Sequence, residues 1–194
     1  MKRILLSVLL LSLSQMVGAI ELAGVKVAEK VQVGGQSLVL NGAGTRLMVG
    51  MFHVYAIALY LPEPKHSVAE VLDEQSRKRV TLDFMFGVTS VQLLEATYKL
   101  MTENLSADEM KRAEAGWKQF ATVFDKVPDI NKGDHMVLDH QPGTGVSVSL
   151  NGKEIGRVAD ARFIRGFLMA WLGDRPAQAD LKDRLLGITA ANGK

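Results

Sequence analysis

The chain has 194 residues, of which 47% are hydrophobic and 23% charged, with a net charge of +2 and no cysteine. This length suits a single domain with a full-sized core. The nearly neutral charge argues against nucleic-acid binding, which usually requires a basic stripe, and the lack of cysteine excludes disulfides, thiol catalysis and cysteine-based zinc sites.

The first nineteen residues have the pattern of a signal peptide. Lys2 and Arg3 precede an apolar run over residues 4–13, and residues 17–19 (VGA) have the small-x-small pattern of a cleavage site. The apolar run is too short to cross a hydrocarbon core of roughly 30 Å as a helix. We therefore expect residues 1–19 to be removed and the mature chain, residues 20–194, to be exported with no integral membrane segment.

Removal of this segment also changes the charge. It holds two of the 23 basic residues and none of the 21 acidic ones, so the mature chain has 23 − 2 = 21 basic and 21 acidic residues. A neutral mature chain gives no reason to expect a nucleic acid or an anionic membrane surface as partner.

The first half of the mature chain predicts strands. Residues 25–33 and 37–41 are extended runs separated by the turn signal Gly34-Gly35. Residues 41–61 (NGAGTRLMVGMFHVYAIALYL) are rich in β-branched and aromatic residues and end before prolines, and residues 79–86 (RVTLDFMF) alternate apolar and polar side chains.

The periodicity then becomes helical. Thr89 followed by Gln92, and Ser106 followed by Glu109, are capping-box patterns that predict two helix starts. Apolar residues recur behind them at three- and four-residue spacing. In the first helix these are Leu94, Tyr98, Met101 and Leu105, and in the second Met110, Ala113, Trp117, Phe120 and Phe124. Pro128 ends the second helix.

The last third predicts a hairpin followed by two helices. Strands at residues 135–140 and 146–150 flank Pro142-Gly143, and Asn151-Gly152 predicts a type I′ turn into a strand at residues 153–158. Asp160 is expected to cap a helix that stops at Gly173, and Pro176 to start a final helix that ends at Leu186-Gly187. Runs of strands and runs of helices indicate an α+β fold, an antiparallel sheet with helices on one face.

The commonest catalytic and metal-binding patterns are missing. The sequence contains no GxSxG, HExxH or Walker motif. His135 and His140 lie five residues apart on a predicted strand and so point to opposite faces, while His53 and His66 have no partner at ligand spacing. We therefore expect no metal and no cofactor, and we interpret Trp117, Phe120 and Trp171 as core residues.

Arg46 is the only permanent charge in residues 41–61. It could be structural, capping a turn or pairing with a carboxylate at the edge of the sheet. It could instead bind an anionic ligand at the end of an apolar cavity, because arginine binds carboxylates through two parallel hydrogen bonds. Tyr55 adds a phenol to an otherwise apolar strand. Composition alone leaves both interpretations open.

Several segments resemble the chalcone isomerase-like family, in its exported bacterial branch. They are NGAGTR (41–46), FHVYAIALYL (52–61), PGTGV (142–146), NGK (151–153), WLGD (171–174) and LLG (185–187). The resemblance covers nearly all of residues 20–194. It implies one domain with an open-faced β-sandwich fold, in which a large antiparallel sheet and a helical layer enclose a cleft, and it implies a periplasmic location.

The resemblance also suggests site residues. Plant chalcone isomerases use an arginine with a tyrosine and a threonine, whereas fatty-acid-binding relatives hold a carboxylate with the same arginine and a tyrosine. Arg46 matches the shared arginine, and Tyr55 falls where the fatty-acid binders have their tyrosine. The catalytic tyrosine of the isomerases corresponds to residues 91–94, which contain none. Tyr98 is expected to line the cleft.

Three hypotheses follow. The first is a non-catalytic periplasmic protein that binds an apolar acid such as a fatty acid through Arg46, Tyr55 and Tyr98. The second is an isomerase or lyase acting on a phenolic or enone substrate, in which Arg46 stabilises an anionic transition state. The third is an interaction module of the cell envelope without a small ligand, in which Arg46 is structural. The ligand and the oligomeric state are not predicted.

Overall fold

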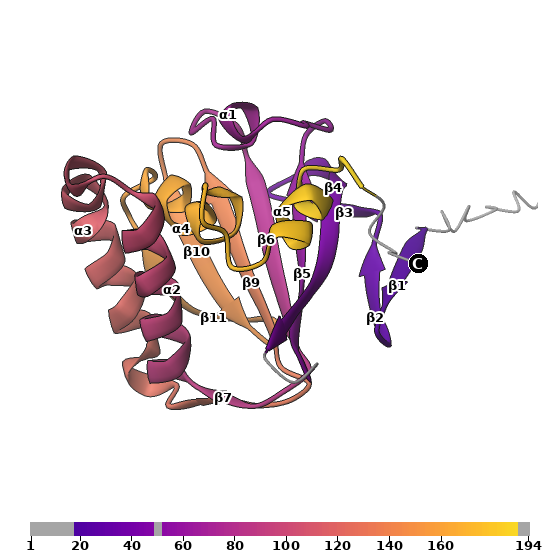
Figure 1. Cartoon of the computed structure of the whole chain (residues 1–194), viewed down its shortest axis with the longest axis horizontal. Coiled ribbons are helices and arrows are strands. Elements are labelled where there is room, and N and C mark those ends of the chain that lie inside the picture. Colours follow the sequence, from indigo (N-terminus) through magenta and orange to yellow (C-terminus); the bar gives the residue numbers. More distant parts are fainter. Residues whose placement is uncertain (1–17, 49–51, 190–194) are drawn as a thin grey trace, which may run out of the picture.

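A large antiparallel sheet covered by helices on one face makes up most of the protein (Figure 1). The structure is a computed structural model that describes residues 18–48 and 52–189, so nearly all of the expected signal peptide lies outside the described residues. Within these residues the sheet has seven strands in the order β11-β10-β9-β6-β5-β4-β3. They are β3 (Lys30–Val33), β4 (Gln36–Met48), β5 (Phe52–Leu61), β6 (Lys78–Phe84), β9 (His135–Gln141), β10 (Gly145–Leu150) and β11 (Lys153–Val158).

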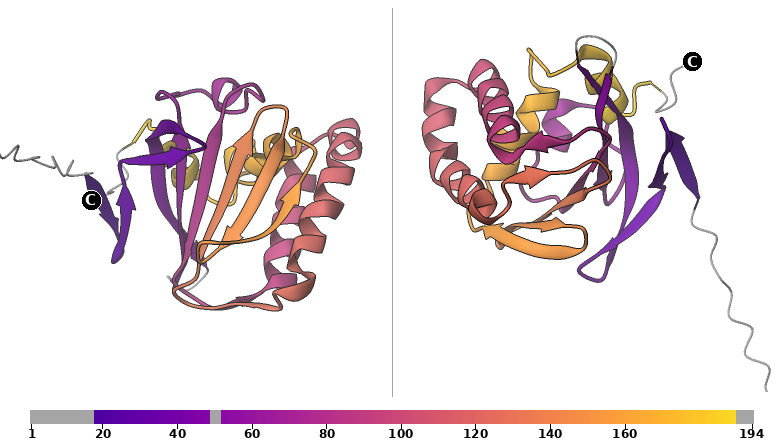
Figure 2. Two further views of the ribbon diagram at one scale, coloured as in Figure 1. Left: turned by 180° about the vertical axis from the view of Figure 1, so that it is seen from behind. Right: turned by 90° about the horizontal axis from the view of Figure 1, so that it is seen from below.

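Smaller elements complete the fold. Two short sheets pair β1 (Ala19–Leu22) with β2 (Val25–Ala28), and β7 (Val88–Thr89) with β8 (Asp129–Ile130). The helices are α1 (Val68–Val71), α2 (Ser90–Asn104), α3 (Ala107–Val123), α4 (Phe163–Leu172) and α5 (Ala179–Leu185), with a 3-10 turn at Phe124–Lys126. Viewed from behind, the strands lie in front and the helical layer lies behind them (Figure 2, left). The expected α+β arrangement is therefore confirmed.

The two faces of β5 belong to two cores. Tyr55, Ile57 and Leu59 face the helices and join the main core, as the two-residue period of a strand requires. Ala56 and Ala58 on the opposite face join a smaller apolar cluster, to which the β1–β2 hairpin contributes Leu22 and Val27. The strand is consequently buried on both faces, which explains its nearly continuous apolar sequence.

Both capping boxes and the type I′ turn predicted from the sequence are confirmed, whereas residues 37–61 divide differently from the prediction, into β4 and β5. Thr89 and Gln92 form a complete capping box at the start of α2, and Ser106 and Glu109 form another at the start of α3. Asn151 and Gly152 have φ angles of 53° and 77°, which is the left-handed backbone that a type I′ turn needs.

The starts of the last two helices were predicted wrongly. Asp160 does not cap α4. Its carboxylate accepts the backbone N–H of Arg162 at 3.0 Å, and the helix begins one residue later. Residues 176–178 are not helical, because the N–H of Ala177 donates to the carbonyl of Ala170 and attaches this segment to α4. The four-residue α1 and the two-residue strands β7 and β8 are too short to show a periodicity, and the sequence did not predict them.

Helix α5 packs unusually closely on the helix-covered face of β4. A Cβ atom on Gly42 would lie 1.9 Å from the carbonyl oxygen of Arg184, so only glycine permits this approach. Asn41 reinforces the contact, because its amide donates to the carbonyl of Leu185 at 2.7 Å and accepts the N–H of Lys65 at 2.6 Å. The residues before α5 are thereby brought beside the end of β4 that carries Arg46.

A buried pair of basic groups lies near the other end of the sheet. Lys78 and His140 are opposite each other on β6 and β9 and have no exposed surface. The ammonium of Lys78 donates to the carbonyls of Asp73 and Ser76 at 2.7 and 2.9 Å. Nδ1 of His140 lies 3.1 Å from the Ser76 carbonyl, and Nε2 has no hydrogen-bond partner in the described part of the chain. Since a carbonyl can only accept, Nδ1 carries the proton.

His140 should make stability depend on pH. Burial, followed by the charge of Lys78, lowers the pKa of His140 from 6.5 to about 4. Between these values the unfolded chain binds a proton that the folded protein does not, so stability decreases as the pH falls through this window. We expect the wild type to lose about 1–3 kcal/mol more than His140→Gln between pH 7 and pH 4.5, measured by urea unfolding. The exposed His53→Gln is the control and should behave like the wild type; equal losses in all three proteins would contradict the prediction.

Candidate functional site

Arg46 and Tyr55 are direct neighbours across two strands. Arg46 on β4 is paired with Tyr55 on β5, and the register shifts immediately afterwards, where Leu47 pairs with His53. Directly opposed residues of an antiparallel pair lie on the same face, with their Cβ atoms about 4.5–5.5 Å apart. Since Tyr55 belongs to the main core, both side chains lie on the face that the helices cover.

The guanidinium of Arg46 is held by neutral groups. Its Nη1 atom donates to the carbonyl of Leu47 at 2.6 Å and to the side-chain oxygen of Gln178 at 3.4 Å. It is half-buried and forms no ion pair with any residue in the ranges 18–48 and 52–189. The carboxylate partner that the structural interpretation expected is therefore missing from the described protein.

The phenol of Tyr55 accepts a hydrogen bond from Trp171. The indole Nε1 atom of Trp171 lies 3.0 Å from the Tyr55 oxygen, and both residues are buried. Because an indole can only donate, the phenol oxygen is the acceptor, and its own hydrogen is available to another group. Burial raises the pKa of Tyr55 to about 12, although the Trp171 hydrogen bond and the Arg46 charge act in the opposite direction. The phenol is therefore protonated at neutral pH and can donate.

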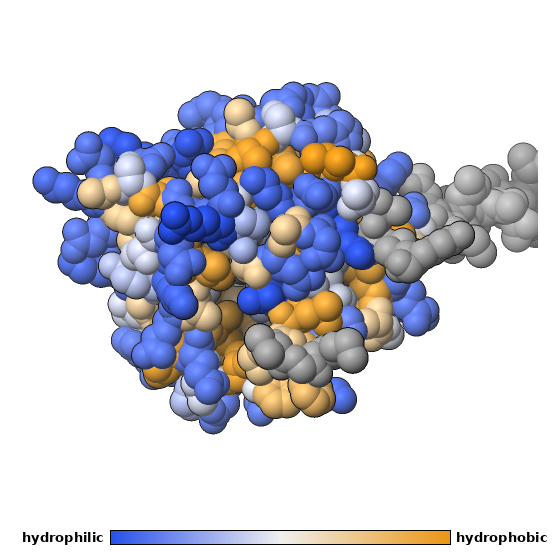
Figure 3. Space-filling view, viewed as in Figure 1, coloured by the Kyte–Doolittle hydropathy of each residue, from blue (hydrophilic) through white to orange (hydrophobic). Residues whose placement is uncertain are grey.

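Arg46 and Tyr55 border a largely apolar cavity of about 350 Å³. The end of β4, the start of β5 and the end of β6 form one side, and α2 and Trp171 form the other. Its apolar lining residues are Leu47, Met48, Val54, Phe84, Phe86, Val88, Leu93, Ala96, Leu100 and Trp171. The space-filling view shows apolar surface in the lower part of this face, between α2 and the ends of β4 and β5 (Figure 3).

The other polar side chains of the cavity already have partners. The hydroxyl of Thr97 donates to the carbonyl of Leu93 at 2.8 Å, one helical turn earlier. The side-chain oxygen of Gln92 accepts the N–H of Thr89 as part of the capping box. Arg46 and Tyr55 are thus the residues best placed to contact a polar head group in this cavity.

The structure places Tyr98 elsewhere, which corrects the expectation that it lines this cavity. Leu93, Thr97 and Leu100 of α2 face the cavity, whereas Tyr98 points towards α3. Its ring lies 5.2 Å from that of Trp117, centroid to centroid, in a separate surface groove. The helical spacing of Tyr98 with Leu94 and Met101 was noted correctly, but it did not reveal which neighbour the ring would meet.

Sequence reasoning missed two residues of the site, Trp171 and Gln178. Trp171 was interpreted as core and is indeed buried, yet it also lines the cavity and polarises Tyr55. The signal that could have indicated this role is its indole N–H, which needs an acceptor when buried. Gln178 has no comparable signal, since a glutamine after Pro176 is an ordinary loop residue.

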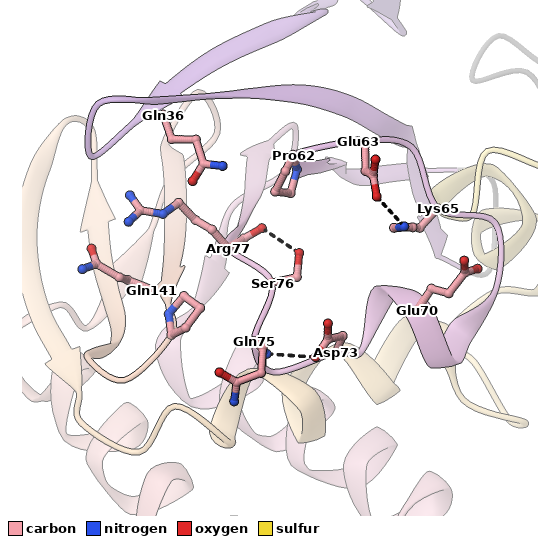
Figure 4. Close-up of a pocket in the computed structure, with 11 residues that line it drawn as sticks. Gln36, Pro62, Glu63, Lys65, Glu70, Asp73, Gln75, Ser76, Arg77 and Gln141 are labelled. Atoms are coloured by element: carbon pink, nitrogen blue, oxygen red, sulfur yellow. Dashed lines mark hydrogen bonds and ion pairs between the residues drawn. The ribbon is translucent and has the colours of Figure 1, made fainter.

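A larger depression of about 560 Å³ lies at the opposite ends of β5 and β6 (Figure 4). Its lining is mostly polar, and its charged groups are engaged within the protein. Lys65 pairs with Glu63 at 2.6 Å, and Arg77 donates to the carbonyl of Val33 at 2.8 Å. An open polar basin of this kind offers little apolar burial, so the cavity beside Arg46 is the better candidate site.

Within the described residues, no three side chains of histidine, cysteine, aspartate or glutamate come together to hold a metal ion. None of the helices there has the length and apolar character needed to cross a bilayer.

The sequence model of a family described as chalcone isomerase-like matches residues 19–187. The chain belongs to the chalcone isomerase-like family. A crystal structure of a fatty-acid binding protein from Arabidopsis thaliana has a similar fold, with a TM-score of 0.66, 16% sequence identity, and coverage of 87% of this chain and 96% of that one. At this identity the likeness shows a shared fold, and it confirms the expected chalcone isomerase-like architecture. No curated protein shows significant sequence similarity to this member of the family.

The contribution of the hydrogen bond between Trp171 and Tyr55 to stability can be measured by a double-mutant cycle. Tyr55→Phe leaves a buried indole N–H without an acceptor and should lower the free energy of unfolding by about 1–3 kcal/mol. Combined with Trp171→Phe it should cost less than the sum of the two single changes, with a coupling of about 0.5–3 kcal/mol in urea unfolding. Strict additivity would show that this hydrogen bond contributes nothing to stability.

Proposed function

We propose that this chalcone isomerase-like protein binds an apolar acid, such as a fatty acid, in the cavity beside Arg46 and Tyr55, without converting it. The proposal rests on the surroundings of the Arg46 guanidinium. A half-buried guanidinium, paired with no carboxylate in the described protein, lies across from a phenol that can donate, at one end of an apolar cavity. A carboxylate with an apolar tail complements all three features.

The expected binding free energy has one contribution from the apolar tail of the ligand and one from its head group. The tail contributes affinity through burial, at about 0.8 kcal/mol for each methylene group removed from water. A hydrogen bond to a charged group contributes about 1.5–3 kcal/mol, whereas the phenol of Tyr55 adds a weaker neutral donor. The tail therefore provides most of the affinity, and Arg46 provides orientation and the preference for an anion.

Two observations favour binding over isomerisation. The solved structure with a similar fold is described as a fatty-acid binding protein, which supports the same class of ligand here. In addition, Gln92 and Leu93 line the cavity from the region in which chalcone isomerases are expected to have their catalytic tyrosine. Neither side chain is a phenol, so the catalytic tyrosine of the isomerases has no counterpart at this position of the cavity.

Substitution of Arg46 tests the proposal directly. Arg46→Ala should weaken the binding of a long-chain fatty acid about 10- to 100-fold, measured by isothermal titration calorimetry. Arg46→Lys should restore part of this loss, because an ammonium cannot reproduce the two-pronged contact. Tyr98→Phe is the matched control and should bind like the wild type, since Tyr98 lies outside the cavity.

The thermal stability of the ligand-free variants distinguishes the alternatives. If Arg46 serves a ligand, Arg46→Ala should leave the melting temperature nearly unchanged or raise it, because a partly buried charge has been removed. A large fall in melting temperature, together with no fatty-acid binding by the wild type, would support the structural interpretation and an envelope interaction module. Saturable chalcone cyclisation that is lost in Arg46→Ala would instead support the isomerase.

We also propose that the protein works in the periplasm after loss of its first nineteen residues. The basic start, the apolar run and the VGA sequence support this location. Intact-mass analysis of the protein from the periplasmic fraction should find a chain that begins at Ile20. A mass that includes residues 1–19, or recovery only from the cytoplasm, would contradict it.

A further inference from the structure

Gln178 connects the helical layer to the strand that carries Arg46. It is the N-cap residue of α5, yet its side chain makes no capping hydrogen bond to that helix. The side-chain amide instead reaches β4, where it contacts three successive residues. Its oxygen accepts the N–H of Leu47 at 2.9 Å and Nη1 of Arg46 at 3.4 Å, and its nitrogen donates to the carbonyl of Thr45 at 3.4 Å.

This amide acts like a short piece of a neighbouring strand. Thr45 and Leu47 lie two residues apart on β4, so their backbone groups point to the same edge of the strand. Gln178 accepts from one and donates to the other, as a paired strand would. It does so where the pairing of β4 with β5 becomes irregular, between Arg46 and Leu47. The backbone position of Arg46 therefore depends on Gln178.

The same amide leaves one edge of the Arg46 guanidinium available. A guanidinium has five N–H donors, and the hydrogen bonds of Arg46 within the described residues involve only Nη1. The edge formed by Nε and Nη2 has two parallel N–H groups, which is the geometry that a carboxylate or sulfonate can bind. Because the partners at Nη1 are an amide oxygen and a backbone carbonyl, neither neutralises the positive charge.

We propose that Gln178 determines the head-group specificity of the cavity. It anchors the guanidinium through Nη1 and, being neutral, keeps both the charge and the Nε–Nη2 edge of Arg46 available to an anion. A carboxylate at this position would pair with Arg46 inside the protein and compete with the ligand. This inference rests on the proposed function, because it concerns the same cavity and the same class of ligand.

The matched variants are Gln178→Glu and Gln178→Ala, with dodecanesulfonate as the probe because its head group stays ionised across the pH range of the experiment. At pH 7.5, Gln178→Glu should bind the probe at least ten times more weakly than the wild type. The affinity should recover as the pH is lowered and the introduced carboxyl group becomes protonated. Gln178→Ala adds no charge, so its affinity for the probe should fall only about two- to five-fold. This factor should not change with pH.

A second glutamine controls for the added charge. Gln119 on α3 accepts the N–H of Ala159 at 2.7 Å and does not line the cavity. Gln119→Glu should therefore bind dodecanesulfonate like the wild type at every pH. If Gln178→Glu also binds like the wild type, the proposed role of Gln178 is wrong while ligand binding stands. If the wild type binds neither dodecanesulfonate nor fatty acids, the proposed function itself fails, and the specificity role fails with it.

The anchoring of Arg46 can be tested without any ligand. In the wild type, the side-chain N–H signals of Arg46 should be dispersed in a nitrogen–proton NMR spectrum, and Arg46→Lys identifies them by their disappearance. In Gln178→Ala these signals should move towards the average arginine position, because the guanidinium has lost one of its two acceptors at Nη1. Unchanged Arg46 signals in Gln178→Ala would overturn the positioning role, whatever the ligand experiments show.

Discussion

The contact between α5 and the helix-covered face of β4 is the constraint on which the site depends. Gly42 and Gly44 lie on this face, because they pair with Leu59 and Ile57 of the main core. The helix approaches the strand at backbone distance, which is possible because position 42 has no side chain and because Asn41 bridges the two segments. Once α5 is fixed there, Gln178 at its start lies beside Arg46. The packing of α5 on the sheet therefore also places Gln178 in the site.

The hydrogen-bonding roles of the polar groups in the cavity depend on one another. Trp171 can only donate, so the oxygen of Tyr55 must accept, and the hydrogen of the phenol is left for another acceptor. Burial keeps this phenol protonated by raising its pKa to about 12. Arg46, directly opposite, brings a charge that Gln178 and Leu47 hold but do not neutralise. Tyr55 and Arg46 thus offer donors to the same end of an apolar cavity, which is the arrangement that an anionic head group requires.

Polar groups at the other end of the strands are used differently. Lys78 and His140 are buried without a cavity, and two of their hydrogen bonds go to the single carbonyl of Ser76. Their lowered pKa values, about 8 for Lys78 and about 4 for His140, follow mainly from burial. The two ends of the sheet therefore differ in kind: at one, buried polar groups hold a turn beside an open polar depression, and at the other, polar groups face a largely apolar cavity.

Features that depend only on neighbouring residues could be predicted from the sequence. The capping boxes, the type I′ turn at Asn151-Gly152 and the alternation along the strands each arise within a few positions, and all are present. Arg46 and Tyr55 could be identified because a lone charge and a phenol stand out in an apolar stretch and match positions of the family that the sequence resembles. Only the tertiary structure could add Trp171 and Gln178 and remove Tyr98 from the cavity, since their neighbours are decided by how α2, α4 and α5 pack on the sheet. Such packing depends on contacts between residues more than a hundred positions apart, as between Tyr55 and Trp171, and no local pattern encodes it.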